Sequence, residues 1–252
     1  MQKRIVLITG ATSGIGEATA NLLAKNNCKL IICGRRKDRL ETLQKQLSAF
    51  TEIQALSFDV RNKVEVQKAI ASLPADWKNI DVLINNAGNA HGLDPIQAGS
   101  LDDWDAMLDI NVKGLLYVCH EVMPGMVDKK AGHIINIGSI AGKEVYPNGN
   151  VYSASKFAVD ALTRGMRIDL NAHNIKVTSI NPGMVETEFS LVRFKGDAEK
   201  ASTVYKGFDP LKAMDIADII LFTITRPAHV LLADITVFPT AQASATHVKR
   251  SI

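Results

Sequence analysis

Tyr152 and Lys156 stand four residues apart and could carry out proton transfer. Residues with this spacing lie on one face of the chain if the segment is helical. A free phenol titrates near ~10, and a neighbouring ammonium group favours the phenolate and so lowers the pKa of the phenol. We therefore expect Lys156 to make Tyr152 an acid or base that works near neutral pH. Taken alone, the pattern is short and common, and an ordinary amphipathic helix face would explain it better.

Ser139 is a candidate for the same site. It follows the apolar run at residues 134–137, so it comes where a strand is expected to end. Ligands bind at the carboxyl ends of the strands in parallel sheets. The sequence therefore places a hydroxyl group at an edge where a ligand could bind.

A glycine-rich loop follows the first apolar run of the chain, residues 4–8, and a helical pattern begins at Glu17. Glycines permit a tight turn and let the backbone approach a pyrophosphate, which then rests on the helix N-terminus. The spacing is G-x-x-x-G-x-G and differs from the commonest dinucleotide motif. The position between strand and helix nevertheless predicts a dinucleotide-binding loop. Its candidate residues are Gly10, Ser13, Gly14, Ile15 and Gly16.

The end of the second apolar run, residues 29–33, bears on the choice of cofactor. A site that prefers NAD would place an acidic residue near this point to hold the ribose hydroxyls, but Gly34, Arg35 and Arg36 follow instead. Guanidinium groups match the geometry and charge of a phosphate. We therefore expect NADP, with Arg35 and Arg36 at its 2′-phosphate and Ser13 as a further hydroxyl donor. The alternative is that these arginines only begin a basic, solvated helix.

Apolar runs alternate with helical patterns along the chain, which predicts an α/β fold: a doubly wound, mostly parallel, Rossmann-like sheet in a single domain spanning residues 1–252. Its crossovers should be right-handed. The runs lie at 4–9, 29–33, 53–58, 80–84, 132–138, 175–180 and 234–238, and the helical patterns at 15–27, 37–48, 62–73, 101–128, 152–171 and 213–224. Residues 184–212 break this rhythm and are expected to form a substrate lid, and residues from about 239 a C-terminal tail.

The composition excludes several classes of function. The net charge is only +3 and basic residues are scattered, so nucleic-acid binding is not indicated. No apolar stretch approaches the ~20 residues that span a bilayer, and no signal peptide is recognisable, so we expect a cytoplasmic protein without a membrane partner. Cys28, Cys33 and Cys119 stand in apolar surroundings, which indicates buried thiols. No spacing of histidines and cysteines indicates a metal site.

Several motifs occur together and in order, and through them the chain resembles the short-chain dehydrogenase/reductase family from about residue 4 to about residue 190. They are the loop from Thr9 to Gly16, the run Asn85-Asn86-Ala87-Gly88, Asn111, Ser139, the pair Tyr152 and Lys156, and Pro182-Gly183. The resemblance implies an enzyme that transfers a hydride between NADP(H) and a carbonyl or hydroxyl group.

The resemblance also implies a role for each catalytic residue. Tyr152 would exchange a proton with the substrate oxygen, and Lys156 would lower the pKa of Tyr152 and bind the nicotinamide ribose. Ser139 would hydrogen-bond the substrate oxygen and stabilise its developing charge. Asn111, inside the predicted helix 101–128, would hold a water that relays protons to Lys156. The alternative for Asn111 is an exposed polar position.

Further cofactor contacts follow from the same resemblance. Asp59, followed by Val60, would bond the adenine amino group, although an N-cap for the helix that starts near Asn62 is an equally good role for Asp59. Asn86 would touch the cofactor while Asn85 braces the strands. The remaining expected contacts are Pro182 and Gly183 at the nicotinamide, and Val185 and Thr187 at the carboxamide or pyrophosphate.

Segments 73–81, 136–139, 149–152 and 186–197 are similar to the NADP-dependent 3-hydroxy acid dehydrogenases, which act on serine and allo-threonine. We expect Arg193 or Lys195 in the lid to bind the substrate carboxylate, against the alternative of a solvated charged loop. Other carbonyl substrates (3-oxoacyl, steroid, sugar or pterin) or a non-catalytic NADP-binding sensor remain alternatives. The resemblance implies a homotetramer formed through helices 101–128 and 152–171. Ala158, Ala161 and Leu162 could form such a face or belong to the core.

Overall fold

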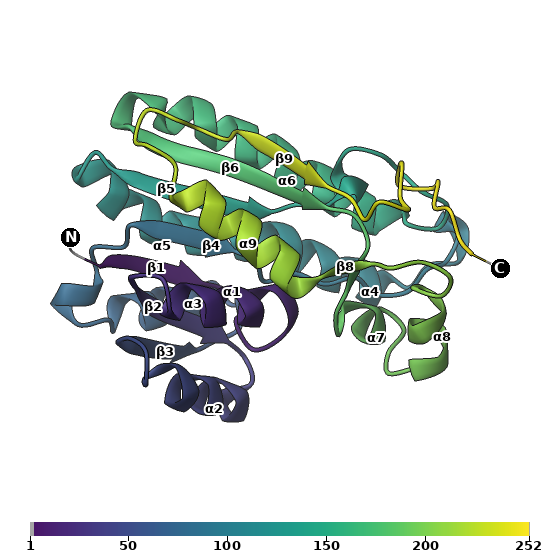
Figure 1. Cartoon of the computed structure of the whole chain (residues 1–252), viewed down its shortest axis with the longest axis horizontal. Coiled ribbons are helices and arrows are strands. Elements are labelled where there is room, and N and C mark those ends of the chain that lie inside the picture. Colours follow the sequence, from purple (N-terminus) through teal and green to yellow (C-terminus); the bar gives the residue numbers. More distant parts are fainter. Residues whose placement is uncertain (1–2, 252) are drawn as a thin grey trace.

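The computed structural model describes residues 3–251, and over that range seven parallel strands form a central sheet in the order β3-β2-β1-β4-β5-β6-β9 (Figure 1). The strands are β1 (Arg4–Ile8), β2 (Cys28–Gly34), β3 (Ile53–Ser57), β4 (Val82–Asn85), β5 (Gly132–Ile137), β6 (Ile175–Pro182) and β9 (Asp234–Val237). A separate parallel pair joins β7 (Val185–Glu186) to β8 (Leu211–Lys212). The predicted doubly wound parallel fold is confirmed.

Helices cover both faces of the sheet (Figure 1). They are α1 (Gly14–Ala24), α2 (Lys37–Leu47), α3 (Lys63–Ala71), α4 (Leu101–Leu108), α5 (Gly114–Asp128), α6 (Asn150–Leu170), α7 (Phe189–Arg193), α8 (Ala198–Thr203) and α9 (Ala213–Ile224). One apolar core joins α1, α2 and α9 to the sheet, and the other joins α3, α5 and α6 to its opposite face. The central strands are apolar on both sides because each face packs on helices.

The chain reverses its direction across the sheet between β1 and β4, which lie side by side. The loops after these two strands lead to opposite sides, and a crevice opens at this switch point, where doubly wound folds bind their ligands. The lid segment (residues 184–212), with α7 and α8, lies beyond the carboxyl ends of the strands on the right of Figure 1. The fold therefore brings the glycine loop, Ser139 and the lid segment to one end of the sheet.

The helix expected over residues 101–128 is not uniform. A π-helical turn, Asp109–Lys113, separates α4 from α5 and contains Asn111. Such turns are frequent at functional sites because they redirect one side chain out of the regular helix. The expectation of a continuous α-helix was therefore wrong at the turn that contains a candidate site residue.

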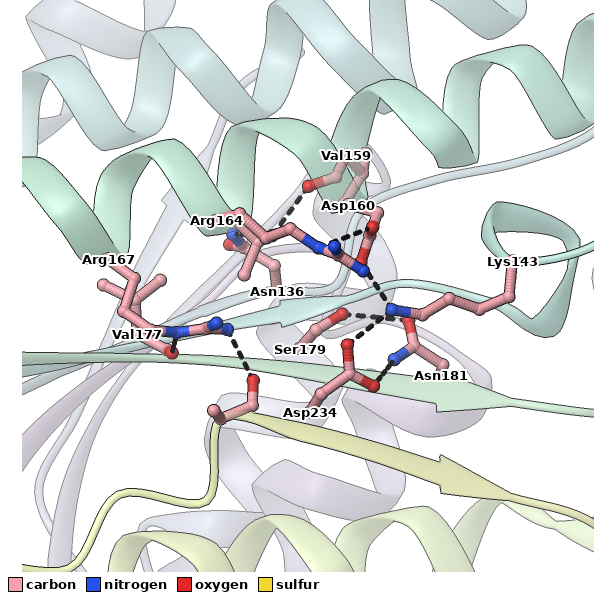
Figure 2. A network of polar contacts seen from close by, with 12 residues as sticks. Asn136, Lys143, Val159, Asp160, Arg164, Arg167, Val177, Ser179, Asn181 and Asp234 are labelled. Carbon is pink, nitrogen blue, oxygen red and sulfur yellow. Dashed lines mark hydrogen bonds and ion pairs between the residues drawn. The ribbon is translucent and has the colours of Figure 1, made fainter.

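The edge strand β9 is held to the rest of the sheet by a polar network around Lys143 (Figure 2). Lys143 lies between Asp160 of α6, at 2.6 Å, and Asp234 of β9. Asn181 of β6 donates to Asp234 at 2.9 Å. Because Lys143 follows Ser139 by only four residues, this network also anchors the turn after β5.

The C-terminal tail folds back as a hairpin over residues 241–249, with Gln242 paired to Val248. Gln242 is buried, and its side-chain oxygen accepts from the backbone N–H of Met184 at 2.8 Å. Beyond the hairpin, the Ser251 N–H donates to the carbonyl of Gly207. This C-terminal hairpin thus packs on the lid segment of its own chain. Among the helices described between residues 3 and 251, none is long and apolar enough to span a membrane.

Candidate active site

A cavity of about 620 Å³ opens at the carboxyl ends of β1, β4, β5 and β6. Its wall combines the glycine loop, the segment after β4, the start of α6, the lid segment and the C-terminal hairpin. Most of the expected site residues line it: Gly10, Ser13, Gly14, Ile15, Arg35, Arg36, Val60, Asn86, Ser139, Tyr152, Lys156, Pro182, Gly183, Val185, Thr187 and Arg193. In the described part of the chain, Gly16, Asp59 and Asn111 lie outside this wall.

The glycine loop requires its glycines for two different reasons. Gly10 and Gly14 have φ angles of +64° and +55°, which other residues rarely adopt. A Cβ on Gly16 would clash with the carbonyl oxygen of Gly10. Gly16 therefore allows α1 to pack against the loop and does not itself form the cavity wall.

Two asparagines, Asn85 at the end of β4 and Asn86 just after it, hold the loop and the strands together. The Asn86 side chain donates to the carbonyls of Thr9 and Gly10 at 3.0 and 3.1 Å. Asn85 donates to the Asn136 side chain at 2.8 Å and so links β4 to β5. The loop that would hold a pyrophosphate is therefore fixed by two partly buried hydrogen bonds from the residue that follows β4.

The arginines after β2 lie at the mouth of the cavity. Arg36 donates to the hydroxyls of Thr12 and Ser13, at 3.1 and 2.8 Å, and pairs with Glu188 of the lid segment at 3.0 Å. The alternative interpretation, a merely solvated helix start, does not account for these contacts of Arg36. Arg35 pairs with Asp59 at 3.5 Å.

Asp59 is not a helix cap, so that alternative was wrong. The cap of α3 is Asn62, whose side chain accepts from the N–H groups of Val64 and Glu65. Asp59 instead pairs with Arg61 at 2.6 Å. Its carboxylate is therefore occupied by arginines beside the cavity.

Tyr152 and Lys156 both lie at the buried start of α6, with Ser139 just beyond β5. The Lys156 Nζ donates to the carbonyl of Ile137 at 2.9 Å and lies 6.0 Å from the centroid of the Tyr152 ring. The Ser139 hydroxyl accepts from the N–H of Ala141 at 3.1 Å. These three side chains meet at the cavity, as the sequence led us to expect.

The pKa of Tyr152 moves in the opposite direction from the one expected. Burial raises the pKa of Tyr152 to about 12, and Tyr146 adds to this, while Arg193 and Ser139 lower it. Burial also lowers the pKa of Lys156 to about 8. The expected lowering by Lys156 is not found: the groups that lower this pKa are Arg193 and Ser139, and the removal of the phenol from water outweighs both.

Asn111 is buried, so the alternative of an exposed polar position was wrong. Its amide donates to the carbonyl of Asn89 at 2.9 Å and to the Ser155 hydroxyl at 3.0 Å, and its oxygen accepts from the Asn89 N–H at 2.9 Å. A Cβ on Gly88 would lie 3.0 Å from the Asn111 oxygen and 3.7 Å from the Lys156 Nζ. Asn111 therefore lies near Lys156, and its two hydrogen bonds to the backbone of Asn89 hold the segment after β4 in place.

Arg193 projects from α7 onto the candidate acid/base. Its guanidinium carbon lies 5.0 Å from the centroid of the Tyr152 ring and 5.6 Å from those of Tyr146 and Phe189. It donates to the Tyr146 hydroxyl, while its buried Nε has no hydrogen-bond partner among residues 3–251. Lys195 instead pairs with Asp103 at 3.0 Å and is 63% exposed. Of the two cations considered for the lid, Arg193 lies in the site.

Comparison with known proteins decides the family. Residues 4–197 match the short chain dehydrogenase family. The chain belongs to this family. It is 46% identical, over 96% of its length and 97% of the relative, to an NADP-dependent 3-hydroxy acid dehydrogenase of Salmonella typhi. It is 44% identical, over 95% of each chain, to sulfoacetaldehyde reductase 2 of Chromohalobacter salexigens.

The solved structures agree with this assignment. The closed form of a serine dehydrogenase complexed with NADP+ superimposes with a TM-score of 0.92, at 44% identity and over 98% of this chain and 100% of that chain. A serine dehydrogenase from Escherichia coli has a TM-score of 0.82 at 39% identity, over 95% of this chain and 99% of that chain. The described residues thus share the fold of these two structures.

The cavity of this short-chain dehydrogenase fits an NADP dinucleotide. Its volume of about 620 Å³ falls within the usual range of cofactor sites. A Cβ on Gly10 would lie 2.9 Å from the Cα of Ala87, so the glycine loop packs directly against the segment after β4. Arg35 and Arg36 offer guanidinium donors at one end and Lys156 an ammonium at the other. The positive charge of these donors and their positions at opposite ends of the cavity both suit the cofactor.

Several residues of the wall were missed at the sequence level. Tyr146 and Phe189 flank Tyr152, with Phe189 edge-on at a centroid distance of 5.6 Å. Gln242 and Glu188 also line the cavity. These positions lie in the turn before α6, the lid segment and the tail, where no periodicity predicts which way a side chain points. The one signal for these residues in the sequence was that charged and aromatic side chains, Glu188, Phe189 and Arg193, lie close together in the lid segment.

Proposed function

We propose that this short-chain dehydrogenase is an NADP-dependent oxidoreductase that transfers a hydride between NADP(H) and the hydroxyl or carbonyl of a small 3-hydroxy acid, such as serine or allo-threonine. The observation that carries the proposal is the position of Arg193. Its guanidinium, whose buried Nε is unpaired among residues 3–251, lies directly against the ring of Tyr152. This supports a role for Arg193 in binding a substrate carboxylate next to the proposed acid/base.

The distance between these two groups suits a short substrate. A carboxylate bound by Arg193 would be only a few bonds away from a hydroxyl bound by Tyr152 and Ser139, as in a 3-hydroxy acid. Guanidinium groups bind carboxylates in a planar, bidentate manner. The names of the relatives support this: one is an NADP-dependent 3-hydroxy acid dehydrogenase and another a serine dehydrogenase with NADP+.

Tyr152 would act as general base in alcohol oxidation and as general acid in carbonyl reduction. The raised pKa of Tyr152, about 12, keeps the phenol protonated at neutral pH, which is the form needed to donate to a carbonyl oxygen. Ser139 would donate a hydrogen bond to the same oxygen and stabilise its developing negative charge. NADP supplies the hydride acceptor or, when reduced, the hydride donor.

Lys156 and Asn111 would support the proton path behind Tyr152. With a pKa of about 8, Lys156 is mostly protonated at neutral pH and can bind the nicotinamide ribose. Asn111 contacts Asn89 and Ser155 directly, and a water held there would connect Lys156 to solvent. We propose that Lys156 binds the ribose and that Asn111 holds the water that relays protons to Lys156.

The cofactor contacts are proposed residue by residue. Arg35, Arg36 and Ser13 would hold the 2′-phosphate, and Gly10, Gly14 and Ile15 the pyrophosphate, with Gly16 closing the loop. Asp59 and Val60 would flank the adenine and Asn86 the adjoining ribose. Pro182, Gly183, Val185 and Thr187 would contact the nicotinamide end.

A second candidate substrate shares the same chemistry. One relative is named sulfoacetaldehyde reductase, and the guanidinium of Arg193 would pair with a sulfonate as readily as with a carboxylate. The two substrates both combine an anion with a nearby oxidisable or reducible carbon. A substrate panel separates them.

The experiment is an absorbance assay at the reduced-nicotinamide band. L-Serine, L-allo-threonine and 3-hydroxybutyrate are each supplied with NADP and with NAD, and L-serine methyl ester serves as the control that lacks the carboxylate. Reduction of NADP by the acids, with little reduction of NAD and little activity on the ester, is the expected result. Activity confined to sulfoacetaldehyde, or to neutral 3-oxoacyl, steroid, sugar or pterin carbonyls, would replace the 3-hydroxy acid assignment. Tight NADPH binding with no turnover on any of them would favour a sensor.

We further propose a cytoplasmic homotetramer. Phe157 and Ile168 on α6 are 41% and 76% exposed, and Leu116 on α5 is also exposed, so both helices carry apolar side chains that a partner subunit would cover. Leu162, one of the residues considered for this face, is partly buried and packs against the core. Light scattering on the purified protein tests the assembly, and a monomer at micromolar concentration would exclude it.

A further inference from the structure

The guanidinium of Arg36 is shared between two regions that are far apart in the sequence. From the glycine loop, the Thr12 and Ser13 side chains accept from its Nε and NH2 groups, at 2.8 to 3.2 Å. From the lid segment, Glu188 accepts from its NH1 group at 3.0 Å. The arginine best placed for a 2′-phosphate is therefore already bound to a carboxylate.

Glu188 is bound to a second arginine at the same time. Its other carboxylate oxygen accepts from Arg39 of α2 at 2.8 Å. The hydrogen bond from Arg39 lowers the pKa of Glu188, so the carboxylate is ionised at neutral pH. One negative charge thus bridges two cations on the rim of the cavity.

The bridge is attached to the substrate end of the site. Glu188 directly precedes α7, and α7 carries both Phe189 and Arg193, which pack on Tyr152. Thr187, the preceding residue, would lie 3.3 Å from a Cβ on Gly14. A change in the partner of Arg36 would therefore alter the contacts at the N-terminus of α7, the helix that carries Arg193.

A 2′-phosphate and the Glu188 carboxylate require the same donors. Both are anions that accept from a guanidinium in its plane, and like charges a few ångströms apart repel each other. NAD carries a neutral hydroxyl in place of this phosphate, so it brings no charge that competes with Glu188 for Arg36. The Glu188 carboxylate would thus repel bound NADP but not bound NAD.

We propose that Glu188 is a specificity-determining residue for the coenzyme, whose carboxylate competes with the 2′-phosphate of NADP for Arg36 and so weakens NADP binding selectively. This rests on the proposed function, because it takes Arg36 as the phosphate contact. When NADP binds, Arg36 passes from Glu188 to the phosphate, and Glu188 stays attached to Arg39. Glu188, at the start of α7, thereby loses its contact with Arg36 when NADP binds but keeps it when NAD binds.

The test is the dissociation constant of NADP+ and of NAD+, measured by calorimetry for the wild type, Glu188→Gln and Glu186→Gln. The amide in Glu188→Gln keeps the shape of the side chain and removes its charge. Glu186→Gln is the matched control: it removes a lid carboxylate of similar exposure that pairs with Lys212, away from Arg36. We expect Glu188→Gln to tighten NADP+ binding by about three- to tenfold and to change NAD+ binding by less than about twofold. The control should leave both constants unchanged.

Other results would overturn the proposal. An equal change for both coenzymes would show that Glu188 acts only on the structure of the lid. Weaker NADP+ binding would show that Glu188 orients Arg36 for the phosphate and does not compete with it, and an unchanged constant would show no competition. A wild type that binds NAD+ as tightly as NADP+ would instead remove the NADP assignment itself. That result is visible before any variant is measured, so the two failures can be told apart.

Discussion

The two halves of the cavity wall are built in different ways. The coenzyme half consists of strand ends and the glycine loop, with buried Thr9, Thr12 and Asn85 and a close backbone packing that only glycine permits. The substrate half is the lid segment, whose helices α7 and α8 are short and carry several exposed apolar and charged side chains. The first half is fixed by backbone geometry, and the second by a few side chains.

This difference separates two kinds of change. In the coenzyme half, a side chain added at Gly10 or Gly16 meets backbone at less than 3 Å, so a substitution at either position disrupts the fold of the loop. In the lid segment, Arg193 and Glu188 could be replaced without displacing any strand. We infer that coenzyme binding depends on the fixed backbone of the coenzyme half, while the choice of substrate depends on side chains of the lid segment.

The largest expected effect comes from Tyr152→Phe. Removal of the hydroxyl should lower kcat by about a thousandfold or more, because the general acid and base is lost. The phenylalanine ring preserves the edge-on contact with Phe189. Steady-state kinetics and NADPH titration check this together, and a variant that retains a tenth of the activity would remove Tyr152 from its proposed role.

Arg36→Ala should have the next largest effect, and only on NADP. Loss of charge-assisted hydrogen bonds to a phosphate should raise the KM for NADP by about ten- to a hundredfold, and the KM for NAD should stay the same. Lys37→Ala is a matched control, since Lys37 is an exposed neighbour that pairs only with Glu41 among the described residues. Equal losses with both coenzymes would contradict the assignment of the phosphate site.

The two reaction directions should depend differently on pH. With a pKa of about 12 for Tyr152, the phenolate needed for oxidation should become more abundant by about tenfold per pH unit up to strongly alkaline pH. Reduction needs the neutral phenol and should fall only as Lys156 loses its proton above about pH 8. If the oxidation profile of kcat/KM levels off near neutral pH, then Lys156 lowers the pKa of Tyr152 after all.

Arg193→Ala tests the substrate half of the cavity wall alone. The KM for L-serine should rise by about fivefold to tenfold, because one charged hydrogen bond at a partly open site is lost. NADP binding should be unaffected. Lys195→Ala is the control, because Lys195 is exposed and pairs with Asp103. If both variants behave like the wild type, the carboxylate is bound elsewhere.

The smallest effect is expected for Lys143→Met, outside both halves. This change leaves Asp160 and Asp234 without their shared cation in the network of Figure 2. The free energy of unfolding should fall by about 1–2 kcal/mol, less than for a fully buried pair because Lys143 is partly exposed. Thermal unfolding should shift down by about 2–6 °C, and Lys143→Arg should recover most of it. A wild-type melting temperature for Lys143→Met would show that the network does not stabilise β9.

Much of the coenzyme half could be predicted from the sequence. Strand ends, the turn at Gly10 and the arginines after β2 follow from apolar runs and residue types that have few other uses. The order of the motifs also predicted that Ser139, Tyr152 and Lys156 would lie together. Local patterns sufficed because each of these positions is fixed by the strand or helix that it begins or ends.

The rest depends on contacts between distant segments. The pKa of Tyr152 is set by its burial and by Tyr146 and Arg193, and no spacing reports how much water they exclude. The π-helical turn at Asn111 accompanies bonds to Asn89 and Ser155, which the helical pattern of residues 101–128 does not contain. The partner of Glu188 lies 152 residues away in the chain. Properties of this kind become visible only once the fold brings the segments together.

The most direct test of the central claim is to follow deuterium from L-serine labelled at its hydroxyl-bearing carbon during the reaction with NADP. If the enzyme oxidises a 3-hydroxy acid by hydride transfer, mass spectrometry should find one deuterium in the NADPH formed, and kcat/KM should be lower than for unlabelled serine. Reduced coenzyme without deuterium, or no reduction of NADP by serine or allo-threonine, would contradict the account.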